Sequence, residues 1–309
     1  MKNQFTLAGF VSLAIAAVLF TGCATKPTLK HAYKNDFKIG VAMNERQITG
    51  EDTNGVALIK KQFSSISPEN VMKWASIHPY ATNSPGTNAY NFGPADAYVE
   101  FGEKNGMYIV GHTLIWYSQT PRWVFEDTNG RRLNGTNAAD RALLLQRMHD
   151  HIQTVVGRYK GRVKTWDVVN EALNENGTLR KSPWEKFIGP DYIAKAFEYA
   201  HEADPNATLR YNDFLLENAP KRNGAIKLIK SLQSEGVPVM AIGLQGHEKL
   251  DWPTLEQEDA TISAFAKLGL KVNITELDID TSPSTQRNRS ADINLNGQEE
   301  DESNQNASL

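Results

Sequence analysis

Seven short apolar runs alternate along this 309-residue chain with longer segments in which apolar residues recur at helical spacing. Strands that alternate with helices indicate a parallel sheet with helical crossovers. An apolar fraction of 40% is enough for a sizeable core. The predicted strands are 37–43, 64–67, 107–115, 163–169, 207–212, 239–244 and 271–275, and the predicted helices are 56–63, 140–159, 194–203, 225–232 and 254–268.

Two of the predicted strands end in a glutamate. Asn170 and Glu171 follow the strand 163–169, and Glu276 follows the strand 271–275. The C-terminal ends of the strands in a parallel barrel carry the active site. Two carboxyl groups that flank a glycosidic bond are the minimum for its hydrolysis, one protonated and one ionised. The alternative is that both glutamates simply begin solvated loops.

Charge and motif content exclude several classes of function. The formal net charge is −3, whereas proteins that bind nucleic acid usually carry a basic excess. The single cysteine rules out a disulfide within the chain. No glycine-rich phosphate loop precedes a helix, which argues against a nucleotide cofactor. His112 and His247 lie far apart in the sequence, and the acidic residues among which they lie have other predicted roles, which argues against a metal site. We therefore expect no nucleic-acid partner, no cofactor and no metal.

The N-terminal segment has the features of an export signal. A basic start at 1–3 precedes an apolar run at 10–20 that is too short to span a membrane comfortably, and Cys23 follows. This resembles a bacterial lipoprotein signal, which is cut before a cysteine that becomes lipidated; an ordinary secretory signal is the alternative. We predict a signal peptide over 1–22, a tether over 23–36 and a membrane anchor at Cys23, on the outer membrane or cell surface, with the periplasmic side as an alternative.

The C-terminal segment lacks the pattern of the rest of the chain. From residue 281 onward the sequence is polar, with an acidic run at 299–302 and no apolar periodicity. Such composition is typical of disorder. We predict a catalytic barrel over 37–283 and a disordered polar tail over 284–309.

Six sequence motifs follow the predicted strands in order. They are Ser67-Pro-Glu-Asn-Val-Met-Lys-Trp74, Gly111-His-Thr-Leu-Ile-Trp116, Trp166-Asp-Val-Val-Asn-Glu-Ala-Leu173, Tyr211-Asn-Asp213, Gly243-Leu-Gln-Gly-His247 and Ile274-Thr-Glu-Leu-Asp278. Through these motifs the chain closely resembles glycoside hydrolase family 10, the (β/α)8-barrel endo-β-1,4-xylanases. The resemblance spans roughly residues 37–283 and implies an α/β fold, the TIM barrel.

The resemblance assigns roles to the residues at the strand ends. Glu171 corresponds to the acid/base and Glu276 to the nucleophile of a retaining mechanism, for which the two carboxyl groups lie about 5–5.5 Å apart. Asn170 corresponds to the residue that binds the sugar 2-hydroxyl. His247, at the end of the strand 239–244, and Asp278 correspond to residues that hold the nucleophile ionised and oriented.

The resemblance also implies a set of residues that bind sugar on the glycone side. Amides, carboxylates and a lysine supply directed hydrogen bonds, and a tryptophan supplies a stacking face, although Trp116 could equally belong to the core. The chain departs from the family at Tyr117, where a histidine is common, and at Phe214, where a tyrosine is common. The predicted binding residues are Glu69, Asn70, Lys73, His112, Trp116, Gln119 and Gln245.

The eighth strand and closing helix of the family are not recognisable in this sequence. We therefore expect a barrel truncated after strand seven, with two exposed sheet edges. The sequence predicts a monomeric retaining endo-β-1,4-xylanase that acts on xylan and xylo-oligosaccharides through a covalent glycosyl-enzyme. The alternative is a non-catalytic, surface-tethered xylan-binding protein.

Overall fold

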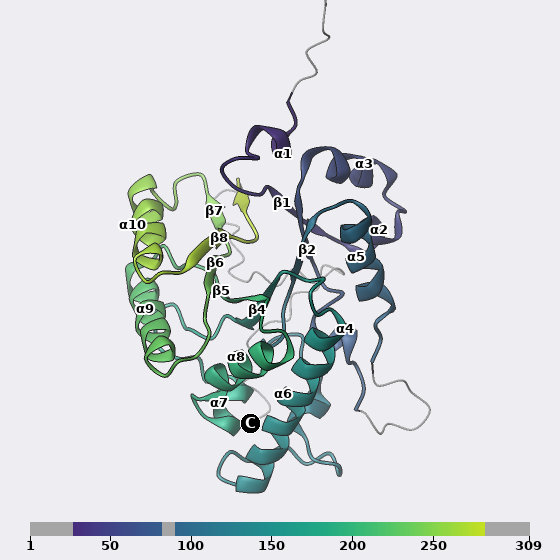
Figure 1. Cartoon of the computed structure of the whole chain (residues 1–309). Coiled ribbons are helices and arrows are strands. Elements are labelled where there is room, and N and C mark those ends of the chain that lie inside the picture. Colours follow the sequence, from purple (N-terminus) through teal and green to yellow (C-terminus); the bar gives the residue numbers. More distant parts are fainter. Residues whose placement is uncertain (1–26, 82–89, 282–309) are drawn as a thin grey trace, which may run out of the picture.

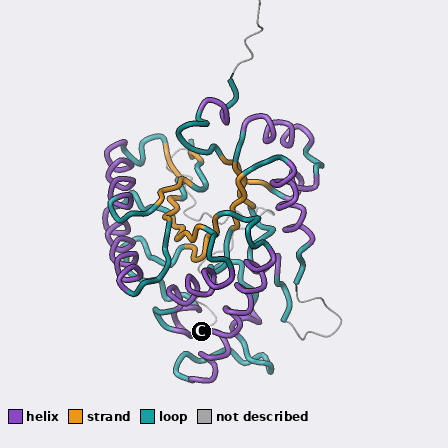
Figure 2. The backbone as a smooth tube through the Cα atoms, viewed as in Figure 1, coloured by secondary structure: helices purple, strands orange, loops and turns teal. Residues whose placement is uncertain are grey.

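A parallel sheet of seven strands forms the centre of the protein, whose computed structural model describes residues 27–81 and 90–281. Figure 2 shows the strands as an arc with the helices around its outside, the arrangement of a TIM barrel. Each predicted apolar run overlaps one of these strands, with ends that differ by a few residues, which confirms the predicted fold class. In sheet order they are β1 (Gly40–Met43), β2 (Ser65–Pro68), β3 (Tyr108–Gly111), β4 (Thr165–Asn170), β5 (Thr208–Asp213), β6 (Ala241–Leu244) and β8 (Lys271–Ile274).

All five predicted helices are present, with ends shifted by a few residues. They are α3 (Thr53–Gln62), α6 (Ala138–Arg158), α8 (Tyr192–Ala203), α9 (Ala219–Ser234) and α10 (Leu255–Ala266). In α6, the Asn137 side chain caps the first turn by accepting a hydrogen bond from the amide of Ala139. The buried residues of α6 recur at helical spacing and form one face; they include Leu144, Met148, His151, Ile152, Val155 and Val156.

Several helical segments were not predicted: α1 (Leu29–Ala32), α2 (Glu45–Thr49), α4 (Trp74–Ile77), α5 (Gly93–Lys104), α7 (Pro183–Ile188) and the 3-10 turn η1 (Arg122–Phe125). The most substantial is α5, whose glycines and proline weaken a helical pattern. Pro94 lies in its first turn, where proline is tolerated. A Cβ on Gly102 would lie 2.5 Å from the Ile109 side chain, so this glycine allows α5 to approach β3 closely.

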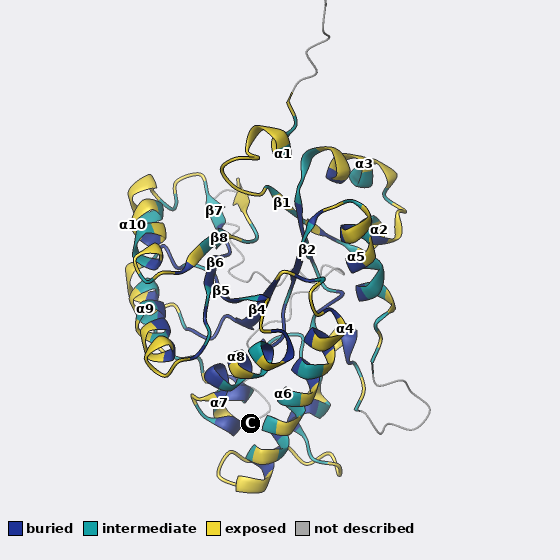
Figure 3. Cartoon of the chain, in the orientation of Figure 1, coloured by how far each residue is buried: buried dark blue, intermediate teal, exposed yellow. Residues whose placement is uncertain are grey.

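The strands β4, β5 and β6 are buried along almost their whole length, as Figure 3 shows. Trp166 on β4 is fully buried against β3. A Cβ on Gly111 would lie 2.2 Å from the Trp166 ring, so glycine at this position makes room for the indole. Burial of such a side chain stabilises the fold by about 2–3 kcal/mol. The added methyl group of Gly111→Ala would displace the indole and destabilise the fold.

A small second sheet lies beyond the strand ends. Strand β7 (His247–Lys249) pairs in parallel with β9 (Asp278–Asp280), and His247 lies opposite Asp278. The prediction that His247 ends the strand 239–244 was therefore wrong, because β6 stops at Leu244. Gly246 turns the backbone between β6 and β7, and its φ of 76° is a conformation that favours glycine.

Within the described residues, β1 and β8 each have a neighbour on one side only. Figure 1 shows these two strands at the two ends of the arc. Apolar side chains are exposed on and after β8 and beside β1, as expected where a sheet face lacks cover. They include Phe37, Ile274, Leu277 and Ile279. The predicted tail, 284–309, lies outside the described residues.

Part of the predicted tether is in contact with the barrel. The amide of Leu29 donates to Oε1 of Gln62 at 2.9 Å, and the Lys30 ammonium donates to the carbonyl of Lys60, so α1 contacts α3. The predicted signal peptide and Cys23 lie outside the described residues. Among the helices that are described, none is long and apolar enough to cross a membrane.

Candidate active site

The two predicted catalytic glutamates follow two strands of one sheet, β4 and β8, at the C-terminal ends of those strands. Glu171 follows the last residue of β4, and Glu276 comes two residues after β8. Strands β4, β5, β6 and β8 are consecutive in the sheet and parallel, so their C-terminal ends share one rim. Glu171 is buried, with 3% of its surface exposed, whereas the Glu276 side chain is 32% exposed.

Three side chains donate hydrogen bonds to the carboxylate of Glu171. The indole Nε1 of Trp116 donates to Oε2 at 3.0 Å, and the amides of Asn170 and Gln245 donate to Oε1 at 3.1 and 2.9 Å. Each donor comes from a different strand end, so the fold fixes both oxygens. Gln245, predicted to bind sugar, is 1% exposed and has its amide nitrogen on Glu171.

Glu276 is surrounded by groups that favour its ionised form. Burial opposes ionisation, but His247, His112 and the Asn212 amide together hold the pKa of Glu276 below its usual range. The Asn212 amide donates to Oε1 at 2.8 Å, and Nε2 of His247 lies 3.4 Å from Oε2. A carboxylate that stays ionised in this way suits the role of a nucleophile.

His247 connects Glu276 to Asp278, as the resemblance implies. Its Nδ1 lies 2.7 Å from Oδ2 of Asp278, across the β7–β9 pair. Burial opposes the imidazolium, but contacts with Glu276 and then Asp278 outweigh this and raise the pKa of His247 to about 9. The ring is therefore positively charged at neutral pH.

Asn212 is a central residue of the site to which the sequence analysis assigned no role. It lies opposite Asn170 in the β4–β5 pairing, and its amide donates to both Asn170 and Glu276 at 2.8 Å. Thr275 donates to its carbonyl oxygen at 2.7 Å, which fixes the amide orientation. A Cβ on Gly243 would lie 2.2 Å from that oxygen, so glycine makes room for it. The only sequence signal was its place in the motif Tyr211-Asn-Asp213.

Three of the predicted sugar-binding residues form one hydrogen-bonded row. The Lys73 ammonium donates to Gln119 at 2.7 Å, and the Gln119 amide donates to Asn70 at 3.2 Å. Lys73 also lies 4.9 Å from the centre of the Trp116 ring. Trp116 is 6% exposed with its nitrogen on Glu171, so it belongs both to the core and to the site.

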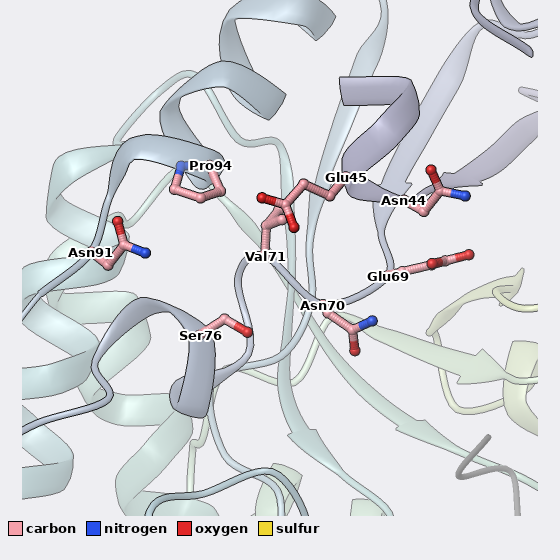
Figure 4. Close-up of a pocket in the computed structure, with 8 residues that line it drawn as sticks. All are labelled: Asn44, Glu45, Glu69, Asn70, Val71, Ser76, Asn91 and Pro94. Atoms are coloured by element: carbon pink, nitrogen blue, oxygen red, sulfur yellow. The ribbon is translucent and has the colours of Figure 1, made fainter. Parts of the chain in front are cut away.

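A cavity of about 300 Å³ adjoins this row, and Figure 4 shows the side chains that line it. Glu69 and Asn70, on the loop after β2, form one side of it. Carboxylate, amide and hydroxyl groups provide the polar part of the lining, and these are groups that bind sugar hydroxyls. The remaining lining residues are Asn44, Glu45, Val71, Ser76, Asn91 and Pro94.

His112 is held by an ion pair that the sequence analysis did not recognise. Its Nδ1 lies 3.0 Å from Oδ2 of Asp167, and Arg210 donates to both oxygens of Asp167, at 2.6 and 3.0 Å. Burial opposes ionisation of Asp167, but Arg210 and then His112 lower its pKa to about 2. Asp167 and Arg210 lie opposite each other on the adjacent strands β4 and β5. No local sequence pattern around either residue indicates that the two side chains pair.

No group of three or more histidine, cysteine or acidic side chains among residues 27–81 and 90–281 is arranged to hold a metal ion. The described site consists of carboxylates, amides, imidazoles and aromatic rings. This donor set can perform acid–base and nucleophilic chemistry on a neutral polar substrate.

Known proteins are similar to this chain in sequence and in fold. The family model described as glycosyl hydrolase family 10 matches residues 28–307, and so extends past residue 283. The endo-1,4-beta-xylanase A of a Caldicellulosiruptor species is 47% identical over 257 residues, which are 82% of this chain; the chain spans only 36% of that relative.

Solved structures agree with the sequence comparison. A GH10 endoxylanase retrieved from a sugarcane soil metagenome superposes with a TM-score of 0.78 at 43% identity, over 84% of this chain and 74% of that one. Xylanase 10B of Thermotoga petrophila, crystallised with xylobiose, gives 0.75 at 40% identity, over 84% and 75%. With the family match over nearly the whole chain and the predicted glutamates on the same rim of the sheet, this chain belongs to glycosyl hydrolase family 10.

Proposed function

We propose that the chain is a retaining endo-β-1,4-xylanase, with Glu276 as the nucleophile and Glu171 as the acid/base. The observation that carries the proposal is the difference between the two carboxyl groups. Glu276 is held ionised by His247 and Asn212, whereas Glu171 is buried against the Trp116 indole. Two carboxyl groups with such different surroundings suit the two roles of a double displacement.

In the first step, a carboxylate oxygen of Glu276 attacks the anomeric carbon of a xylosyl unit. Glu171 donates its proton to the glycosidic oxygen, the glycosidic bond breaks, and the shortened chain leaves. In the second step, the ionised Glu171 removes a proton from water as the water oxygen attacks the same carbon. The ester to Glu276 then breaks, and the anomeric configuration is retained.

The surroundings of the glutamates fit a neutral sugar chain as substrate. Lys73, Gln119 and Asn70 already hydrogen-bond to one another, so they form a preorganised polar surface. Asn170 is placed between Glu171 and Asn212, where its amide can meet the hydroxyl next to the anomeric carbon. The Thermotoga petrophila relative binds xylobiose, which supports xylan and xylo-oligosaccharides as the substrates.

The two roles can be separated with two variants. Glu276→Ala should lose hydrolysis of xylo-oligosaccharides and regain turnover with azide, giving a glycosyl azide of inverted configuration. Glu171→Ala should keep the first step on substrates with good leaving groups but release the covalent sugar slowly, because the base is gone. Full hydrolysis by Glu276→Ala, or equal responses of both variants to leaving-group acidity, would refute these assignments.

Within residues 27–81 and 90–281, β1 and β8 each have one edge without a neighbouring strand, and this favours a second candidate, a surface-tethered protein that binds xylan without cleaving it. A binding protein would pull down insoluble xylan and release no reducing sugar from it. An assay of both quantities on the same sample decides between the two, and reducing sugar released by wild type but not by Glu276→Ala excludes the binding protein.

A further inference from the structure

The backbone at Glu171 is held in an uncommon conformation. Its φ is 56°, in the left-handed region that a non-glycine residue seldom adopts. Such a conformation persists only where the surroundings enforce it, and at a catalytic residue it directs the side chain. The polar backbone groups on both sides of the Glu171 α-carbon therefore need partners that fix them.

Three hydrogen bonds fix this segment. The amide of Glu171 donates to the carbonyl of Asn212 at 2.9 Å, and the Glu171 carbonyl accepts from Nε of Arg180 at 3.1 Å. The next amide, that of Ala172, donates to the hydroxyl oxygen of Tyr211 at 3.1 Å. The first bond belongs to the strand ladder, whereas the other two are made by side chains.

The Tyr211 hydroxyl is itself oriented by a buried acid. It donates its proton to Oδ2 of Asp213, two residues farther along β5, and this leaves an oxygen lone pair for the Ala172 amide. Tyr211 and Asp213 are both fully buried. The orientation of the hydroxyl thus depends on an acceptor at position 213.

Lys221 on α9 holds Asp213 in turn. Its ammonium lies 2.7 Å from Oδ1 of Asp213, and neither side chain is exposed to solvent. Burial raises the pKa of Asp213 to about 6 although Lys221 opposes the shift. A fully buried ion pair is weak evidence for stability, because the desolvation of both charges offsets their attraction. A role other than stability is therefore worth testing.

We propose that Tyr211, oriented by Asp213 and Lys221, is a positioning residue for the acid/base Glu171. The hydroxyl acts through the Ala172 amide: it fixes the left-handed turn that directs the Glu171 carboxyl toward the glycosidic oxygen. The inference rests on the proposed function, since it concerns the proton that Glu171 transfers. Tyr211 itself contacts neither substrate nor reacting atoms.

The test uses Tyr211→Phe, which removes only the hydroxyl. The matched control is Tyr98→Phe, because Tyr98 is also fully buried and its hydroxyl bonds only to the carbonyls of Ile66 and Val110, away from Glu171. Both variants are assayed on a phenyl β-xylobioside, whose leaving group needs a proton, and on a 2,4-dinitrophenyl β-xylobioside, whose leaving group does not.

For Tyr211→Phe we expect kcat/KM on the phenyl substrate to fall about tenfold or more, as expected for a misplaced general acid. On the dinitrophenyl substrate kcat/KM should stay within about twofold, while kcat and KM fall together because the base of the second step is also misplaced. Exchange of the Ala172 amide hydrogen should accelerate. Tyr98→Phe should leave the ratio of the two substrates and the Ala172 exchange at their wild-type values.

The double variant Asp213→Leu/Lys221→Met, which removes the acceptor without leaving a charge buried alone, should reproduce the selective loss on the phenyl substrate. If Tyr211→Phe loses activity equally on both substrates, or no more than Tyr98→Phe does, the hydroxyl has only a structural role and the inference is overturned. A wild-type chain that hydrolyses neither xyloside overturns the proposed function, and this inference with it. An active wild type with an unchanged substrate ratio in Tyr211→Phe overturns the inference alone.

Discussion

Nε2 of His247 lies 3.4 Å from Oε2 of Glu276, and this contact couples the charge of the proposed nucleophile to that of an imidazolium. The other ring nitrogen of His247 is occupied by Asp278, so the ring is fixed in place. Each group favours the charged form of the other: the pKa of Glu276 is lowered, and that of His247 is raised to about 9. The ion pair is therefore lost at low pH, where Glu276 becomes protonated, and at high pH, where His247 loses its proton.

The loss of this ion pair at high pH can be measured as a decrease in the free energy of unfolding. The folded-state pKa of His247 lies above its usual 6.5. The contribution of the protonated ring to the unfolding free energy is therefore complete below about pH 6.5 and is lost as pH rises through about 9. Wild type should exceed His247→Gln in unfolding free energy by on the order of 1 kcal/mol at about pH 6, and less at about pH 9.5. Urea denaturation at the two pH values measures this, with the exposed His31→Gln as control. A difference that does not change with pH would contradict the prediction.

The buried lysine on α9 should be intolerant of substitution. Lys221→Met leaves Asp213 buried without its partner and should destabilise the fold by about 3–5 kcal/mol. Lys230→Met, at an exposed position of the same helix, should stay within about 0.5 kcal/mol of wild type. Chemical denaturation gives both values, and equal stabilities of the two variants would show that the ion pair is dispensable.

In the part of the chain that the structure describes, β1 and β8 each have one edge without a partner strand, and we expect these edges to limit stability. A strand that bonds to both edges, followed by a helix over the exposed Ile274, Leu277 and Ile279, would satisfy backbone groups and cover apolar surface. Fusing such a unit from a longer family member to residues 24–309 should raise Tm, by about 2–4 °C for each kcal/mol gained, reduce aggregation and increase turnover together. Equal melting and equal activity without the added unit would refute this.

Export and anchoring at Cys23 remain a proposal from the sequence. In a bacterial host, labelled fatty acid should enter the wild-type chain and be absent from Cys23→Ser. The mature wild-type protein should begin at Cys23. Sequencing of the mature N-terminus checks this, and any other first residue would favour an ordinary secretory signal.

The class of fold could be predicted from the sequence because strand and helix periodicity are local properties. Each predicted apolar run overlaps a strand, and the glutamates follow β4 and β8 as the sequence indicates. The helix α5 was missed because Gly93, Pro94 and Gly102 weaken its local signal, while its packing against β3 compensates for them.

The sequence by itself determined which residue types stand at the strand ends, and hence the predicted pair of carboxyl groups. Only the tertiary structure decided which partners they have. Asn212 bridges Asn170 and Glu276 because β5 pairs with β4 in one register, and His247 meets Asp278 because β7 pairs with β9. These contacts join residues 31 to 64 positions apart, and strand register, not local sequence pattern, brings such distant side chains within hydrogen-bonding distance.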